Sequence, residues 1–168
     1  MTETPSAVDD NLILLEGQEA FAKHLLQLIQ TARRKVYILS RTLNDALYHD
    51  QEIADALSAL VRNDRNAEVC ILVKKVKPLV ELNHHLLRLA RRLPSKITIK
   101  KLLIEPQDDD RAYLIGDRDL LLYQHDEAEF TGFVNYSAKP EVAKILDDFD
   151  YLWQRQSIVD EDLRSLHL

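Results

Sequence analysis

The chain has 168 residues, 46% of them hydrophobic and 30% charged, and a formal net charge of -6. This length suits a single domain with its own core, and the apolar content excludes a disordered chain. Cys70 is the only cysteine, so no internal disulfide can form, and no apolar run is long enough to cross a membrane. We therefore expect a cytoplasmic protein without membrane insertion.

In chain order, residues 1–11 are polar and are expected to form a flexible tail. Apolar residues three or four apart over 21–32 then predict an amphipathic helix, which leads into the apolar run 36–40. A second helix over 53–61 and a second apolar run over 67–74 repeat the pattern. Continuous apolar runs are typical of strands buried on both faces, and the order strand, helix, strand predicts a right-handed parallel crossover.

One helix is expected from Pro78 to just before Pro94, where leucines recur at helical spacing, and a strand over 97–104 follows it. AYLI and LLLY then flank the turn-forming residues 116–119 and predict a β-hairpin. FTGFVNY is typical of one more strand, and Pro140 opens a last amphipathic helix.

Together these elements predict an α/β fold with a mixed, mostly parallel β-sheet covered by helices on both faces. The domain is expected to span residues 12–156. The polar residues 157–168 are expected to form a C-terminal tail.

The order of these elements, and the local pattern of residues 110–155, resembles one half of a phospholipase D-like domain. In that superfamily the signature His-x-Lys-x-x-x-x-Asp opens a hairpin, and a strand with a preceding glutamate and a helix ending in Phe and Trp come after it. The corresponding segments here are YLIGDRDLLLY, AEFTGFVNY and KPEVAKILDDFDYLW. The resemblance implies a single phospholipase D-like half-domain.

The signature is degenerate when it is placed on this sequence position by position. Asp117 falls on the aspartate of the signature, and Glu129 matches the glutamate of the family. Asp110 stands where the family has its nucleophilic histidine, and Ala112 stands where it has its lysine. Glu127 takes the place of the asparagine in the segment that follows the hairpin. The resemblance therefore implies a degenerate motif pocket that includes these positions and His125.

The missing side chains are the ones that the family's chemistry needs. That reaction uses an imidazole to attack phosphorus and a lysine to hold the negative phosphoryl oxygens. Residues 105–129 also contain nine acidic residues and two basic ones, a charge balance that repels a phosphodiester. We expect a non-catalytic pseudoenzyme that needs no metal or other cofactor and serves in dimerisation, ligand sensing or protein interaction.

An alternative from a different class stays open. His125 lies close to the degenerate signature and is followed by Asp126 and Glu127. An imidazole beside carboxylates can act as a general acid or base. The sequence therefore also allows a phosphodiesterase or a nuclease-like hydrolase with a rearranged active site.

Basic residues are concentrated in one part of the chain. Residues 74–101 contain nine basic residues and one acid, Glu81. Lys74, Lys75 and Lys77 lie between a predicted strand and a helix start, where backbone N–H groups favour anions, so they are candidates to bind a small anionic ligand; the alternative is a solvated basic turn. The lack of interleaved aromatic residues and a pI near 5.5 argue against nucleic acid as a partner.

The predicted helix after Pro78 carries a second, smaller apolar strip on the side away from the core. Val80 and Leu87 form the strip, and His84 and Arg91 lie alongside them. These four residues are a candidate assembly surface, and the alternative is that Val80 and Leu87 are scattered exposed apolar residues. Phospholipase D-like enzymes carry two half-domains, whereas this chain is long enough for one. The resemblance therefore implies a homodimer with a two-fold axis.

Overall fold

The computed structural model describes residues 11–43, 46–103 and 110–164. In this part of the chain, eight strands form one sheet in the order β1-β7-β6-β5-β2-β3-β4-β8. The strands are β1 (Leu12–Glu16), β2 (Lys35–Ser40), β3 (Glu68–Val73), β4 (Ile97–Leu102), β5 (Ala112–Gly116), β6 (Leu120–Gln124), β7 (Thr131–Asn135) and β8 (Ser157–Ile158). The helices are α2 (Gln18–Thr31), α3 (Gln51–Asn63), α4 (Lys77–Leu82), α5 (His85–Arg92), α6 (Lys139–Arg155) and α7 (Glu161–Arg164).

The mixed α/β sheet is confirmed, but the prediction of a mostly parallel sheet is wrong. Only β2, β3 and β4 run parallel to one another, joined by the crossovers that the sequence predicted. Every other pairing is antiparallel: β5 lies beside β2, the β5–β6–β7 meander continues to β1, and β8 pairs with β4. Continuous apolar runs predict a parallel sheet, but β5 and β6 are as buried as β2 and β3 and pair antiparallel, because burial carries no information on strand direction.

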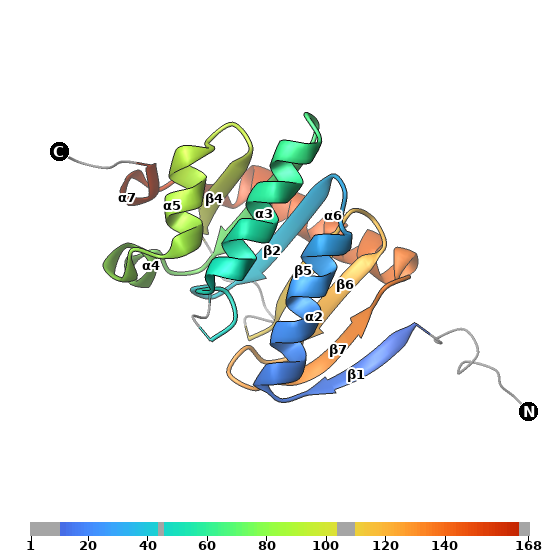
Figure 1. The fold of residues 1–168 in the computed structure, drawn as a ribbon. Helices are drawn as coiled ribbons and strands as arrows, with labels where there is room; N and C mark the ends of the chain where they lie inside the picture. Colours follow the sequence, from blue (N-terminus) through green and yellow to red (C-terminus); the bar gives the residue numbers. More distant parts are fainter. Residues whose placement is uncertain (1–10, 44–45, 104–109, 165–168) are drawn as a thin grey trace, which may run out of the picture.

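Helices cover both faces of the sheet, as expected (Figure 1). On one face, α2, α3 and α5 pack over a core that includes Phe21, Leu57 and Leu86. On the other face, α6 alone crosses the sheet and packs Val142 and Phe149 against it. The sheet therefore has a broad helical layer on one side and a single helix on the other.

The predicted helices at α2, α3 and α6 are present, and α3 and α6 begin with residues that favour a helix N-terminus. Asp50 precedes α3, and its carboxylate accepts a hydrogen bond from the backbone N–H of Glu52 at 2.9 Å. Pro140 lies in the first turn of α6, where a missing N–H costs nothing. None of the described helices is long and apolar enough to span a lipid bilayer.

The single helix predicted after Pro78 is two helices in the structure. Asn83 adopts a left-handed conformation, with φ of 52°, and ends α4. His84 then caps α5, because its Nδ1 accepts a hydrogen bond from the backbone N–H of Leu86 at 3.0 Å. The leucine periodicity continued through this break, so the break was not visible in the pattern.

Both ends of the described chain contain elements that the sequence did not predict. β1 lies within the start of the expected domain and forms one edge of the sheet, while residues 1–10 of the predicted tail lie outside the described residues. The segment expected to be a C-terminal tail contains β8 and α7. Leu163 is only 4% exposed and joins the core of the helical layer, which explains why this segment packs on the domain.

Candidate functional site

The positions of the degenerate signature are divided between the two ends of β5. Asp110 lies just before the strand with an exposed side chain, and Ala112 is its first residue, 3% exposed. Asp117 lies in the turn at the other end, about 16 Å from Ala112 at the usual rise of a strand. The signature therefore does not form one pocket in this chain.

Asp117 holds the hairpin against the loop between α2 and β2. Its carboxylate accepts hydrogen bonds from the backbone N–H groups of Arg33 at 3.0 Å, Arg34 at 2.9 Å and Lys35 at 3.0 Å. The residue also adopts a left-handed conformation, with φ of 56°, which closes the turn between β5 and β6. The one signature residue that this chain keeps thus has a structural role.

His125 and Glu129 both lie on the loop between β6 and β7 with exposed side chains. The His125 ring contacts Tyr123, with centroids 5.0 Å apart, and Phe133, at 6.2 Å. Glu129 contributes a backbone carbonyl that accepts from Gln124 at 3.2 Å. These two residues stabilise the loop, and their side chains do not converge on Asp110.

A buried carboxylate, that of Glu127, occupies the region where the signature begins. Glu127 is 9% exposed, and it accepts hydrogen bonds from the Ser40 hydroxyl and from the backbone N–H of Arg41, the latter at 2.7 Å. Its own N–H donates to the backbone oxygen of Asp110 at 2.6 Å. The Ser40 oxygen in turn accepts from the N–H of Leu43 at 2.9 Å. These contacts join the end of β2, the start of β5 and the β6–β7 loop, and we call them the Glu127 cluster.

The Glu127 cluster holds a negative charge with uncharged donors. No described lysine, arginine or histidine forms an ion pair with Glu127, whereas Arg41 pairs with the exposed Asp110 at 3.4 Å. Burial raises the pKa of the nearby Tyr48 hydroxyl, and the negative charge of Glu127 raises it further. The donors of the cluster hold the carboxylate of Glu127 itself, and the members of the cluster include no imidazole or amine that could serve as nucleophile or acid. Ser40 was not a candidate in the sequence, because a serine that ends an apolar strand carries no distinctive pattern.

The three lysines expected to bind an anion are placed differently from one another. Lys74 is buried, at 6% exposure, whereas Lys75 and Lys77 are exposed. The backbone N–H groups of Lys74 and Lys75 already donate to the carbonyl of Arg41, both at 3.0 Å. α4 has only six residues, and Lys77 lies 3.8 Å from the carboxylate of Glu81. At this turn, two backbone N–H groups are therefore engaged within the protein, and the exposed ammonium groups are those of Lys75 and Lys77.

The four residues of the predicted apolar strip do not share an exposed surface. Val80 is 38% exposed, but His84 and Leu87 are each 1% exposed. The Arg91 guanidinium donates to the backbone oxygens of Asp162 at 2.7 Å and Leu163 at 3.1 Å, so it fastens α7 to α5. The predicted strip assumes one continuous helix. Because the helix breaks at Asn83, the residues of α4 and those of α5 do not follow one helical pattern.

Neither a metal centre nor a reactive thiol is evident in the residues that the structure describes. No three histidine, cysteine, aspartate or glutamate side chains among them are placed to hold a metal ion. Burial raises the pKa of the Cys70 thiol to about 12, and the neighbouring Glu68 adds to the effect. Cys70 therefore stays protonated at neutral pH and is a poor nucleophile.

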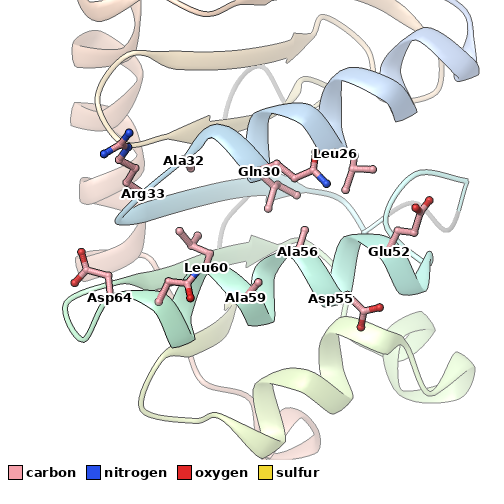
Figure 2. Close-up of a pocket in the computed structure, with 12 residues that line it drawn as sticks. Leu26, Gln30, Ala32, Arg33, Glu52, Asp55, Ala56, Ala59, Leu60 and Asp64 are labelled. Carbon is pink, nitrogen blue, oxygen red and sulfur yellow. The ribbon is translucent and has the colours of Figure 1, made fainter.

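A groove of about 660 Å³ separates α2 from α3, on the helical layer and away from the Glu127 cluster. Alanines on α3, Ala56 and Ala59, leave room for it (Figure 2). Glu52, Asp55 and Asp64 line its α3 side, and Arg33 lies at its α2 end. The groove is lined by Leu26, Ile29, Gln30, Ala32, Arg33, Glu52, Asp55, Ala56, Ala59, Leu60, Asn63 and Asp64. The acids make this groove unsuited to a phosphate ligand, and no sequence-predicted site residue lines it.

A family model described as a domain of unknown function, DUF7931, matches residues 17–166. The chain belongs to the DUF7931 family. The match extends over α7, which agrees with the packing of that helix on the domain. Among curated proteins, none is detectably similar to this DUF7931 chain.

Three solved structures share the fold. Phosphatidylserine synthase from Haemophilus influenzae Rd KW20 is 11% identical with a TM-score of 0.66, over 95% of this chain and 40% of the other. NucT from Helicobacter pylori is 12% identical with a TM-score of 0.59, over 89% of this chain and 97% of the other. Both are phospholipase D-like proteins, so the DUF7931 chain has structural neighbours in that superfamily, in agreement with the resemblance.

The third structure is that of TrmBL2, an archaeal chromatin protein described as showing a novel mode of DNA binding. It is 17% identical with a TM-score of 0.64, and the match covers 94% of the DUF7931 chain and 57% of TrmBL2. The chain thus spans little more than half of that protein. This finding corrects the prediction that nucleic acid is an unlikely partner. That prediction rested on the pI and on the lack of interleaved aromatic residues. Because the fold occurs in a DNA-binding protein, neither property excludes that class of partner.

Proposed function

We propose that the DUF7931 chain is a non-catalytic phospholipase D-like interaction module. The observation that carries this proposal is the Glu127 cluster, where a buried carboxylate lies beside Asp110, the position that the resemblance aligns with the nucleophilic histidine of the family. A second anion could enter only by displacing Glu127 from the hydroxyl of Ser40 and the N–H of Arg41. Asp110 and Ala112 supply neither the nucleophile nor the phosphate-holding cation.

The position of His125 also supports a non-catalytic module over a rearranged hydrolase. Its ring packs on the aromatic residues Tyr123 and Phe133 and forms no hydrogen bond with a described carboxylate. A general acid or base needs a partner that orients it and a phosphate-binding group within reach. Among the residues that the structure describes, His125 has no hydrogen bond to a group that could orient it.

Hydrolysis of a generic phosphodiester tests this proposal. We expect purified protein to release no p-nitrophenol from bis(p-nitrophenyl) phosphate above a protein-free blank, with or without added Mg²⁺. The matched variants are His125→Ala, and Glu129→Ala as a control in the same loop. Turnover by the wild-type protein that disappears in His125→Ala and persists in Glu129→Ala would overturn the proposal in favour of the hydrolase.

Self-association of two copies is part of the proposal. β1 forms one edge of the sheet, and its outer edge has no partner strand among the described residues. Leu14 on β1 is 80% exposed and Ile13 is 42% exposed, and β1 contains no lysine or proline of the kind that protects an edge. Antiparallel pairing of β1 with β1 of a second copy would be two-fold symmetric and would give both side chains cross-strand neighbours. The cytoplasmic location stays a prediction from the sequence.

Nucleic-acid binding is the second candidate function, and one observation favours it. TrmBL2 shares the fold over 94% of this chain and is described as binding DNA. A binding role of this kind needs no catalytic residue, so it is compatible with an interaction module. Fluorescence anisotropy with a labelled DNA duplex measures it directly, and the absence of salt-dependent binding would remove this candidate and leave the non-catalytic proposal in place.

A further inference from the structure

Basic residues of the helical layer lie along α5 from its middle onward, at the end of α3, and in the turns after both helices. Five of them make up what we call the basic face: Arg62, Arg65, Arg88, Arg92 and Lys96. α3 and α5 pack on the same face of the sheet and run in the same direction, because each joins two parallel strands (Figure 1). Their C-terminal ends therefore lie together, and the Lys96 ammonium donates to the backbone oxygen of Arg65.

The basic face is not neutralised by the described carboxylates. Its four arginines are exposed and Lys96 is half-buried, and none of the five forms an ion pair within the described residues. Residues 85–101 contain no acid at all. Asp64, which lies close by on the chain, is paired with Arg34 at 3.6 Å. The surface is therefore positive although the whole chain carries a net charge of -6.

Helix capping explains only part of this arrangement. Cations in the last turn of a helix interact favourably with its C-terminal carbonyls, which accounts for Arg62 and Arg92. Arg65 and Lys96 lie beyond the helices, and Arg88 lies in the middle of α5, where its guanidinium contacts the ring of His85. Three of the five cations thus have no role in capping, and their concentration on one surface fits a ligand with several negative charges.

We propose that the basic face binds the phosphate backbone of duplex DNA. This inference rests on the second candidate function and names the surface that would carry it. Arginine presents a planar fork of donors that matches phosphate oxygens. Residues 51–66 and 85–101 contain no Phe, Tyr or Trp, so the surface offers no platform on which unpaired bases could stack. Contacts of this kind depend on the backbone and are independent of base sequence.

The test is the salt dependence of binding to a short fluorescein-labelled DNA duplex, measured by anisotropy with the full chain. Each phosphate contact adds about -0.9 to the slope of log affinity against log salt. The double variant R88E/R92E should make that slope less negative by about 2 and weaken binding by about tenfold per lost contact at 0.1 M salt. The control K144E/R155E makes the same change in net charge on α6, which lies on the other face of the sheet.

A second pair, R62E/R65E, tests the same surface from α3 and guards against a local defect in α5. We expect both pairs to keep the wild-type far-UV circular dichroism, because the arginines are exposed, and to lower the urea midpoint only slightly, because each favourable charge lost at a helix C-terminus costs about 0.3–1 kcal/mol. If the wild-type protein binds DNA and neither pair differs from K144E/R155E, the inference about the basic face is wrong, while DNA binding itself stands. If the wild-type protein shows no salt-dependent binding, the second candidate function fails together with this inference.

Discussion

Truncation of the buried Glu127 carboxylate should cost a substantial part of the stability of the fold. Glu127→Ala removes the acceptor for two donors, the Ser40 hydroxyl and the Arg41 N–H. Hydrogen bonds to a charged group contribute about 1.5–3 kcal/mol each, and the solvation that the donors regain offsets part of the loss. We expect the free energy of unfolding to fall by about 3 kcal/mol, out of about 5–15 kcal/mol for a domain of this kind.

Urea unfolding followed by circular dichroism measures this loss. With a slope of about 2 kcal/mol per molar urea, the midpoint should fall by about 1.5 M. Glu129→Ala is the matched control, because that side chain is exposed on the same loop, and it should change stability by no more than about 0.5 kcal/mol. Glu127→Gln keeps one carbonyl acceptor and should lie between the two. Equal midpoints for Glu127→Ala and Glu129→Ala would refute the assignment of the cluster as a structural junction.

Two further predictions concern the hairpin and the sheet edge. Asp117→Ala should lower the free energy of unfolding by about 3 kcal/mol, because three backbone N–H groups lose their acceptor and alanine is strained at the left-handed φ. Asp117→Gly should cost about 1 kcal/mol less, because glycine tolerates that φ. Urea unfolding measures both variants, with Asp119→Ala as the control. Sedimentation velocity at micromolar concentration should detect a dimer of the wild-type protein. Leu14→Lys should dissociate this dimer, whereas Ile158→Lys, on the opposite edge strand, should leave it intact. A monomeric wild-type protein would contradict association through β1.

Local patterns in the sequence predicted most of the elements. Burial was visible locally in the apolar runs at β2 and β3 and in the spacing of apolar residues in α2, α3 and α6. The structure has these elements where they were expected. The hairpin formed by β5 and β6 was equally visible, because turn-forming residues separate two short apolar segments. Each of these signals is contained in a window of fewer than about twenty residues.

The features that were missed depend on distant partners or on a single residue. β5 inserts beside β2 in the antiparallel direction, and nothing within either segment specifies that pairing. The break between α4 and α5 depends on the left-handed Asn83 and on the cap from His84. β1 is a short apolar strand at the sheet edge whose partner, β7, follows more than a hundred residues later.

The candidate site was predicted only in part for the same reason. The assignment of Asp110 and Ala112 to the reactive positions of the signature depends on residue identity and on the resemblance, and it stays a prediction. The sequence did not place Glu127 against Ser40, because these residues are 87 positions apart and meet only when β5 and β6 lie beside β2. The basic face was visible as a run of cations, but its extension to α3 required the packing of α3 against α5.

The hydrogen bonds of Asp117 bear on how degenerate relatives of catalytic families can be recognised. A side chain that ties a turn to a neighbouring loop is needed by every copy of the scaffold, active or not, since without it three backbone donors lose their acceptor. The geometry of the turn is therefore sufficient to explain an aspartate at this point of the hairpin, and its presence conveys nothing about chemistry.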